Sequence, residues 1–71
     1  MTIEQIKLDA FVIDIIDDGE NYEAWLSLKN YGVKTLMFGM PKAQQSKDEF
    51  RDLAIANFSE YGEYYLAEYG E

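Results

Sequence analysis

The chain contains neither cysteine nor histidine among its 71 residues, and this double absence limits how so short a protein can be held together. A domain of this size buries only about 60% of the surface that its unfolded chain exposes, so small folds often add a disulfide, a metal site or a partner subunit. Without these two residue types no disulfide forms, and the common zinc and iron–sulfur sites have no ligands. The fold must therefore rest on its own apolar core or on a partner.

The length of the chain predicts one domain that covers residues 1–71. Apolar residues make up 48% of it, which is enough for a folded core and unlike a disordered chain. The N-terminus lacks the basic start and apolar stretch of a secretory signal. Asp9, Asp14 and Asp17 interrupt the longest apolar runs, so we expect no bilayer-spanning segment and a cytoplasmic location.

Acidic residues outnumber basic ones by 14 to 6 and give the chain a net charge of −8. Such a surface repels nucleic acid phosphates and anionic membranes, so we expect neither as a direct partner. A surface of this kind suits solubility or a basic protein partner. The other expected partner, a second copy of the chain, follows from the apolar residues described below.

The side chains that carry most enzyme chemistry are missing or isolated. Histidine, the usual general base, is absent, so the hydroxyls of Ser27, Ser46 and Ser59 have no activating partner of that kind. The scattered glycines form no phosphate-binding loop. We therefore expect a protein that is not an enzyme and has no catalytic residues, no cofactor and no metal site.

Three segments are typical of strands. Residues 6–16, IKLDAFVIDII, are rich in β-branched and aromatic residues, although Thr2 and Gln5 have capping-box spacing and leave a helical alternative open. An Asp-Gly turn at residues 17–21 leads into a second strand at 22–29. A turn at 30–32 precedes a third strand at 33–40, which Pro41 ends.

The C-terminal third of the sequence predicts one amphipathic helix. Ser46 and Glu49 form a capping box ahead of an apolar stripe that continues to about Tyr69, with Gly70 as the stop signal. Gly62 lies inside this stripe and predicts a kink or a division there. The expected fold class is α+β: a three-stranded antiparallel β-meander followed by one C-terminal helix, β-β-β-α.

The first hairpin can be registered by centring it on Gly19, which places Ile13 opposite Trp25 and Asp9 opposite Lys29. In this register Val12, Leu26 and Leu28, joined by Leu36 and Phe38, face the helix. The opposite face is also apolar, and one helix cannot cover both faces of a sheet. We therefore predict a non-catalytic protein–protein interaction module, a homodimer through that face, with these interface residues: Phe11, Ile13, Ile15, Trp25, Val33 and Met37.

A second interpretation concerns the acidic side of the helix. Its surface carboxylates are Asp48, Asp52, Glu60 and Glu63. A rigid row of carboxylates can occupy a groove built for phosphates, which would make the protein a nucleic-acid mimic that inhibits a nucleic-acid-binding protein, as phage and mobile-element antagonists of bacterial defence do. A less favoured alternative is a small metal-binding protein or hydrolase. The carboxylates considered for a cation are Asp14, Asp17, Asp18 and Glu20, whose spacing does not match an EF-hand loop.

Overall fold

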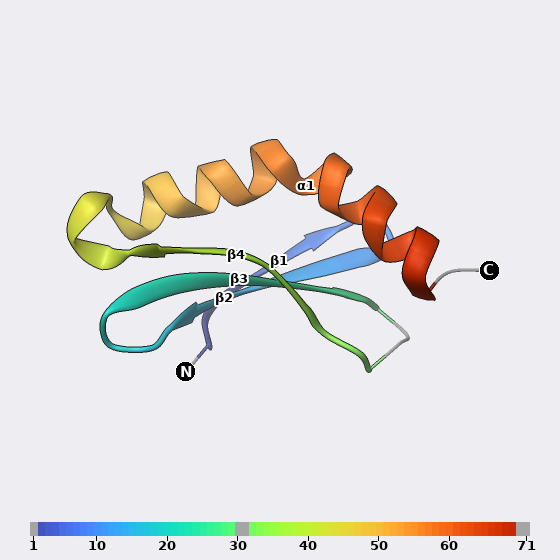
Figure 1. The fold of residues 1–71 in the computed structure, drawn as a ribbon, viewed down its shortest axis with the longest axis horizontal. Coiled ribbons are helices and arrows are strands. Elements are labelled where there is room, and N and C mark those ends of the chain that lie inside the picture. The colour runs from blue at the N-terminus through green and yellow to red at the C-terminus, as the bar shows by residue number, and fades with distance from the viewer. Residues whose placement is uncertain (1, 30–31, 70–71) are drawn as a thin grey trace.

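A computed structural model describes residues 2–29 and 32–69 of the chain. The elements are β1 (Thr2–Leu8), β2 (Phe11–Asp17), β3 (Asn21–Leu28), β4 (Thr35–Pro41), a 3-10 turn (Lys42–Gln44) and α1 (Lys47–Tyr69). The strands form one antiparallel sheet in the order β1-β2-β3-β4, and α1 crosses one of its faces (Figure 1). The α+β class with one C-terminal helix is confirmed, and the sheet has four strands where three were predicted.

The prediction of a single strand over residues 6–16 is wrong, because the chain reverses at Asp9 and Ala10. Asp9 adopts a φ of 56°, the left-handed conformation that aspartate tolerates better than most residues. Leu8 then pairs with Phe11, and the preceding residues form a separate strand, β1, at the edge of the sheet. The backbone oxygen of Ala10 accepts a hydrogen bond from Lys29, which fixes this turn against the end of β3.

The second turn lies where it was predicted, but its register differs by one residue. Gly19, with a φ of 103°, and Glu20 form the tip together, so the hairpin is centred between them. Ile13 therefore pairs with Leu26, and Trp25 pairs with Asp14. Because side chains alternate along a strand, this shift of one residue exchanges the two faces of β2 relative to the prediction.

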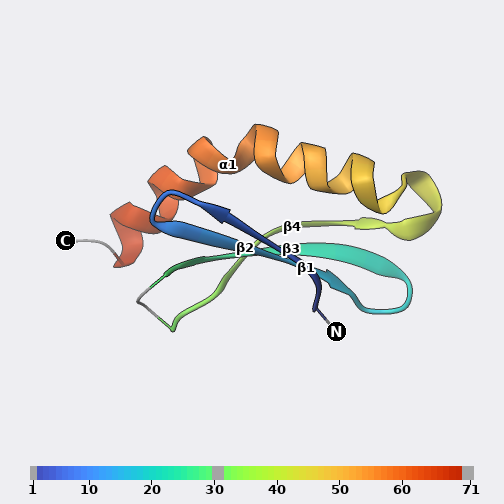
Figure 2. The ribbon, with the colours of Figure 1, turned by 180° about the vertical axis from the view of Figure 1, so that it is seen from behind.

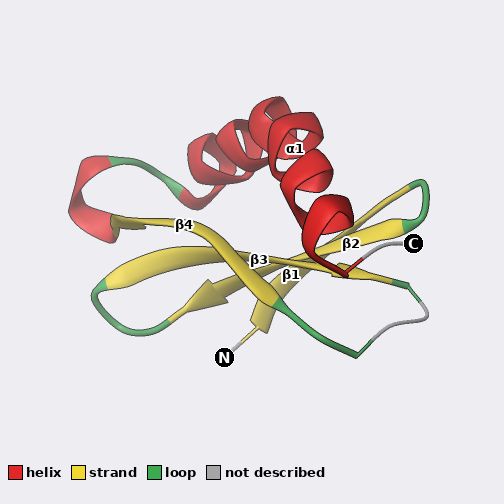
Figure 3. Cartoon of the chain, turned by 45° about the vertical axis from the view of Figure 1, so that its right-hand side comes forward, coloured by secondary structure: helices red, strands yellow, loops and turns green. Residues whose placement is uncertain are grey.

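The predicted capping box at the start of α1 is confirmed. The Ser46 hydroxyl accepts a hydrogen bond from the Glu49 amide at 3.1 Å, and a Glu49 carboxylate oxygen accepts one from the Ser46 amide at 2.9 Å. The helix is continuous through Gly62 and curves toward the sheet (Figure 3), so the predicted division is wrong. The predicted turn at 30–32 lies partly outside the described residues, and the predicted stop at Gly70 lies wholly outside them.

The core lies between α1 and the face of the sheet that it covers. The buried apolar residues are Phe11, Ile13, Ile15, Ala24, Leu26, Met37, Phe50, Ala54 and Tyr65. Aromatic rings connect the two layers: Phe11 meets Phe58 edge-on at 5.3 Å between ring centroids, and Phe50 lies 5.1 Å from Phe38. With the contact between Phe11 and Tyr65, these ring pairs hold α1 to one side of the sheet from Phe50 to Tyr65.

The expected assignment of side chains to the two faces is corrected as a result. Phe11, Ile13, Ile15 and Met37 were predicted on the face away from the helix, and all four lie in the core beneath it. Met37 reaches the core because a β-bulge opposite Ala24 adds one residue to β4. Conversely, Val12 and Leu36 were predicted to face the helix but pair with Ser27 and Trp25 on the other side.

Candidate docking surface

The face of the sheet opposite α1, here termed the open face, is covered by no element among the described residues (Figure 2). Strand alternation places on it every residue paired with Lys7, Val12, Asp14 or Ile16. The open face includes Gln5, Lys7, Val12, Asp14, Ile16, Glu23, Trp25 and Ser27, and Leu36 joins them because it pairs with Trp25. It therefore mixes apolar and charged side chains, in contrast to the apolar core face.

The middle of the open face is apolar. Val12, Ile16 and Trp25 are half-buried there, and Leu36 keeps 47% of its surface exposed. The Trp25 indole nitrogen donates a hydrogen bond to a Glu23 carboxylate oxygen at 3.0 Å, which orients the ring along the strand. Aromatic side chains of this kind are enriched at protein interfaces.

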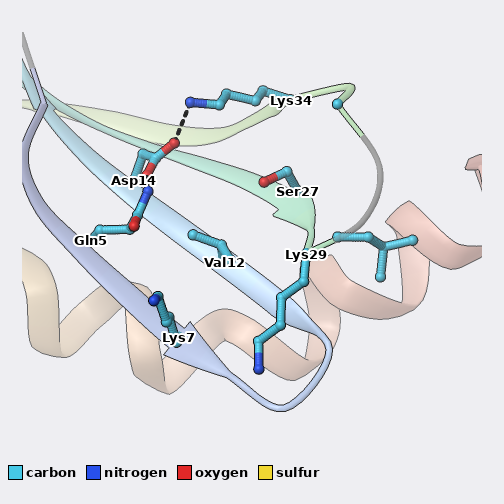
Figure 4. A pocket seen from close by; sticks show the side chains of 9 residues that line it. Gln5, Lys7, Val12, Asp14, Ser27, Lys29 and Lys34 are labelled. Carbon is cyan, nitrogen blue, oxygen red and sulfur yellow. Dashed lines mark hydrogen bonds and ion pairs between the residues drawn. The ribbon is translucent and has the colours of Figure 1, made fainter.

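A hollow of about 500 Å³ lies at one end of the open face (Figure 4). It is lined by Gln5, Lys7, Val12, Asp14, Ser27, Leu28, Lys29, Gly32 and Lys34. Three of the six basic residues of the chain therefore gather at one place on a protein with a net charge of −8. Sequence reasoning missed this cluster because Lys7, Lys29 and Lys34 lie on or beside three different strands.

Asp14 lies at the floor of the hollow and is only 1% exposed. Its carboxylate accepts hydrogen bonds from Lys34 and, at 2.8 Å, from the Gln5 side-chain amide. A buried carboxylate needs such partners because burial removes it from water. Asp14 is therefore a structural anion. Its carboxylate oxygens accept hydrogen bonds from Gln5 on β1 and from Lys34, the residue before β4.

Lys7 and Lys29 differ from Lys34, because neither has an ion-pair partner within 4 Å among the described residues. Both side chains are exposed. Figure 4 shows their amino groups on the same side of the hollow, away from the Lys34–Asp14 pair. This end of the open face thus carries positive charge that the described residues do not neutralise.

The opposite end of the open face is acidic. Glu23 lies on the face itself, and Glu20 lies exposed in the adjoining turn between β2 and β3. The other carboxylates there are engaged: the hydrogen bond from Lys42, at 2.7 Å, lowers the pKa of Asp17 and raises that of Lys42. The backbone amide of Asn21, followed by that of Glu20, lowers the pKa of Asp18. This turn is held by hydrogen bonds that its own backbone amides donate to the Asp17 and Asp18 carboxylates.

The predicted acidic residues of the helix all lie exposed on its solvent side: Asp48, Asp52, Glu60 and Glu63. Arg51 lies beside the first two, at 3.8 Å from Asp48 and 3.4 Å from Asp52, and its pKa is raised chiefly by the hydrogen bond to Asp52. Lys47 lies 3.7 Å from Asp48. The acidic row therefore divides into a first half with neighbouring cations and a second half without them.

The structure brings together only part of the predicted site. Of the six predicted interface residues, Trp25 lies on the open face and Val33, 37% exposed, lies just before β4. Sequence reasoning missed Val12 and Ile16, which a hairpin centre half a residue later would have placed on this face. It also missed Leu36, whose position depends on the pairing of β4 with Trp25.

No cluster of three or more acidic, cysteine or histidine side chains suited to a metal ion occurs within residues 2–29 and 32–69. Among the same residues, none of the helical segments combines the length and the hydropathy of a membrane span. No protein-family model, curated protein or solved structure matches the chain.

Proposed function

We propose that the chain is a non-catalytic protein-interaction module that forms a homodimer through the open face of its sheet. The observation that carries the proposal is the pattern on this face, with an apolar middle between a basic end and an acidic end. Such a surface is complementary to a second copy of itself, and two-fold homodimers are the commonest oligomers.

The charge pattern selects one symmetric arrangement. A two-fold axis that runs across the strands lays the basic end of one copy over the acidic end of the other. Lys29 of each copy then approaches Glu20 and Glu23 of its partner, and the two Trp25 rings meet near the axis. An axis along the strands would instead place Lys7 of one copy near Lys34 of the other, which like charges disfavour.

The size of the face indicates a weak, reversible dimer. Four strands about 4.8 Å apart and seven residues long, at about 3.3 Å per residue, give a face of about 400 Å² per copy. Two copies would then bury about 800 Å² in total, less than a stable specific interface and in the range of weak, transient ones. The accessible surface of one copy, 4534 Å² for 8.2 kDa, is close to the value of about 4,500 Å² typical of a compact monomer of this mass.

Sedimentation analysis at rising protein concentration tests the proposal. We expect a monomer–dimer equilibrium that Lys29→Glu and Glu20→Lys each weaken, because each places like charges together across the axis. In the double variant the two reversed charges face each other again, so dimerisation should return. Glu60→Lys, which changes an exposed charge on α1 by the same amount, should leave the equilibrium unchanged.

Two results would contradict this function. A monomer at all concentrations would exclude the homodimer. Equal weakening by Glu60→Lys would show that net charge, and not the open face, controls association. Trp25→Ala adds a test that does not depend on charge, since it removes the aromatic group nearest the axis and should also lower the dimer fraction.

A second candidate function, nucleic-acid mimicry, is favoured by the latter half of α1. No basic residue follows Arg51 in the sequence, and neither Glu60 nor Glu63 takes part in an ion pair among the described residues. This function predicts salt-sensitive binding to a basic nucleic-acid-binding protein, with competition by DNA. Reversing Glu60 and Glu63 to lysine should abolish that binding, and unchanged affinity would dismiss the idea.

A further inference from the structure

The hollow at the basic end of the open face is lined by two lysines, Lys7 and Lys29, that form no ion pair within 4 Å among the described residues. The chain has 14 acidic residues and only six basic ones. The four basic residues that do form ion pairs are Lys34, Lys42, Lys47 and Arg51. Both unpaired cations therefore lie at one place, where they are available to an anion from outside the chain.

A largely buried hydroxyl opens into the same hollow. Ser27 is 7% exposed, and its side chain makes no hydrogen bond with the described residues. Among these residues, the buried side-chain atoms that are both closed to solvent and without a hydrogen-bond partner belong to Glu4, Thr35 and Gln45. The Ser27 hydroxyl is therefore still accessible, and Figure 4 shows its oxygen turned toward the middle of the hollow. It offers a free hydrogen-bond donor to a molecule bound there.

The sheet places these three donors around one apolar side chain. Lys7 pairs with Val12, and Val12 pairs with Ser27, so the three residues form one row across β1, β2 and β3. Neighbouring strands lie about 4.8 Å apart, which separates the backbones of Lys7 and Ser27 by about 10 Å. Lys29 follows Ser27 by two residues and lines the hollow with it. The flexible lysine side chains can therefore close on a ligand that lies over Val12.

We propose that this hollow binds the phosphate group of a small organic phosphate monoester, with Lys7, Lys29 and Ser27 as its donors. Such a group carries a charge of about −1.5 to −2 at neutral pH and has three acceptor oxygens, which match two ammonium groups and one hydroxyl. A carboxylate carries a single charge and would leave one lysine unneutralised. A water-sized group occupies about 30 Å³, so a hollow of about 500 Å³ also has room for an organic part against Val12 and Leu28.

The net charge of −8 does not prevent an anion from binding at this place. Among the described residues that line the hollow, Asp14 is the acidic one, and Lys34 compensates its charge. The acidic row of α1 lies on the solvent side of the helix, with the sheet between it and the hollow. At physiological ionic strength the Debye length is about 8 Å, so these distant charges are largely screened.

The site also bears on the homodimer. In the proposed dimer the basic end of one copy faces Glu20 and Glu23 of its partner, so a bound phosphate group competes with these carboxylates for Lys29. Phosphate monoesters should therefore shift the equilibrium toward the monomer. This consequence rests on the proposed function, whereas binding of the phosphate group to a single copy does not.

Titration of the dilute, isotope-labelled protein with glycerol 3-phosphate at constant ionic strength, followed by amide NMR shifts, tests the site. The shifts should concentrate on Lys7, Val12, Ser27 and Lys29. Glycerol 3-phosphate should bind roughly threefold more tightly than inorganic phosphate and roughly tenfold more tightly than acetate. Lys7→Gln and Lys29→Gln should each weaken binding roughly three- to tenfold, and Ser27→Ala, which removes one donor and leaves both charges, roughly threefold.

Lys47→Gln is the matched control, because it removes the same charge from α1 and should leave the affinity unchanged. An equal loss in Lys47→Gln, equal affinity for acetate, or no shifts at the hollow would each overturn the site. Equal affinity for inorganic phosphate would overturn the assignment to an ester.

Sedimentation in the presence and absence of glycerol 3-phosphate separates the site from the dimer. We expect the ester to lower the dimer fraction at constant ionic strength. NMR shifts at the hollow with an unchanged dimer fraction would contradict the competition. A protein that is monomeric under all conditions would overturn the homodimer, while the NMR titration would still decide the phosphate site.

Discussion

The Lys34 amino group reaches across β3 to the buried carboxylate of Asp14 on β2 (Figure 4). The same carboxylate accepts a hydrogen bond from Gln5 on β1. One buried anion therefore connects the first strand, the second strand and the residue that precedes the fourth. This link lies on the open face, where no helix contributes to holding the strands together.

Removing the Lys34 amino group should destabilise the fold. Lys34→Met leaves the Asp14 carboxylate buried with one partner fewer, and we expect a loss of about 1–3 kcal/mol in the free energy of unfolding, since the lysine itself is half exposed. Urea denaturation followed by circular dichroism measures this change.

The double variant Asp14→Asn with Lys34→Met provides the control. It removes the buried charge together with its partner, so it should recover part of the stability lost in Lys34→Met alone. If the loss in the double variant equals the sum of the losses in Asp14→Asn and Lys34→Met measured separately, the two groups do not interact. That result would contradict the role assigned to the pair.

Neighbouring residues of β2 should respond very differently to truncation, because they lie on opposite faces. Ile13 is fully buried under α1, so Ile13→Ala should cost about 2–5 kcal/mol, a large part of the stability of so small a domain. Val12 is half-buried on the open face, and Val12→Ala should cost less than about 1 kcal/mol. Thermal denaturation of the pair tests the face assignment, and a larger loss from Val12→Ala would reverse it.

Local signals in the sequence predicted the elements better than their register. The capping box at Ser46 and Glu49, the C-terminal helix α1 and the turn at Gly19 all lie where they were predicted. The exchange of faces followed from placing the hairpin centre on Gly19 instead of between Gly19 and Glu20. A run that is apolar on both faces, such as β2, gives no warning of that error, because either face could form the core.

The first strand was missed for a different physical reason. The turn at Asp9 and Ala10 contains no glycine, and its left-handed residue is an aspartate inside a continuous β-rich run. Likewise, the position of Met37 depends on a bulge that only the pairing of β3 with β4 reveals. The basic cluster of the candidate site depends on strand order, so the sequence alone predicted Trp25 as a surface residue but not its lysine neighbours.

Gly62 is a site where substitution should stabilise the protein. A Cβ atom there would lie 3.6 Å from the Phe11 ring, an ordinary contact, and the residue lies within a continuous helix. Gly62→Ala should therefore raise the free energy of unfolding by about 0.5–1 kcal/mol. Urea denaturation measures the gain, and a loss of stability would show that the Phe11 ring needs the space.

The capping box should make a measurable contribution at the other end of α1. Ser46→Ala removes the acceptor for the Glu49 amide and should cost about 1 kcal/mol. Ser46→Asp keeps an acceptor at the same position and adds a favourable charge at the helix N-terminus, so it serves as the matched control. Equal losses in the two variants, measured by thermal denaturation, would contradict a capping role.

The turn between β2 and β3 should make stability depend on pH in the acid range. Hydrogen bonds from the backbone amides of Asn21 and Glu20 lower the pKa of Asp18 from its ordinary value of 3.8. A lowered folded-state pKa means that the stabilisation is complete above pH 3.8 and is lost as the pH falls through the folded value.

Asp18→Asn keeps an oxygen that accepts these hydrogen bonds but does not titrate. Between pH 5 and pH 2 the melting temperature of the wild-type protein should therefore fall further than that of the variant. At pH 7 the variant should be the less stable of the two, because its oxygen carries no charge. Scanning calorimetry across this range measures both curves. Parallel curves would show that the charge on Asp18 does not stabilise the turn, since the only difference between the proteins is one titrating group.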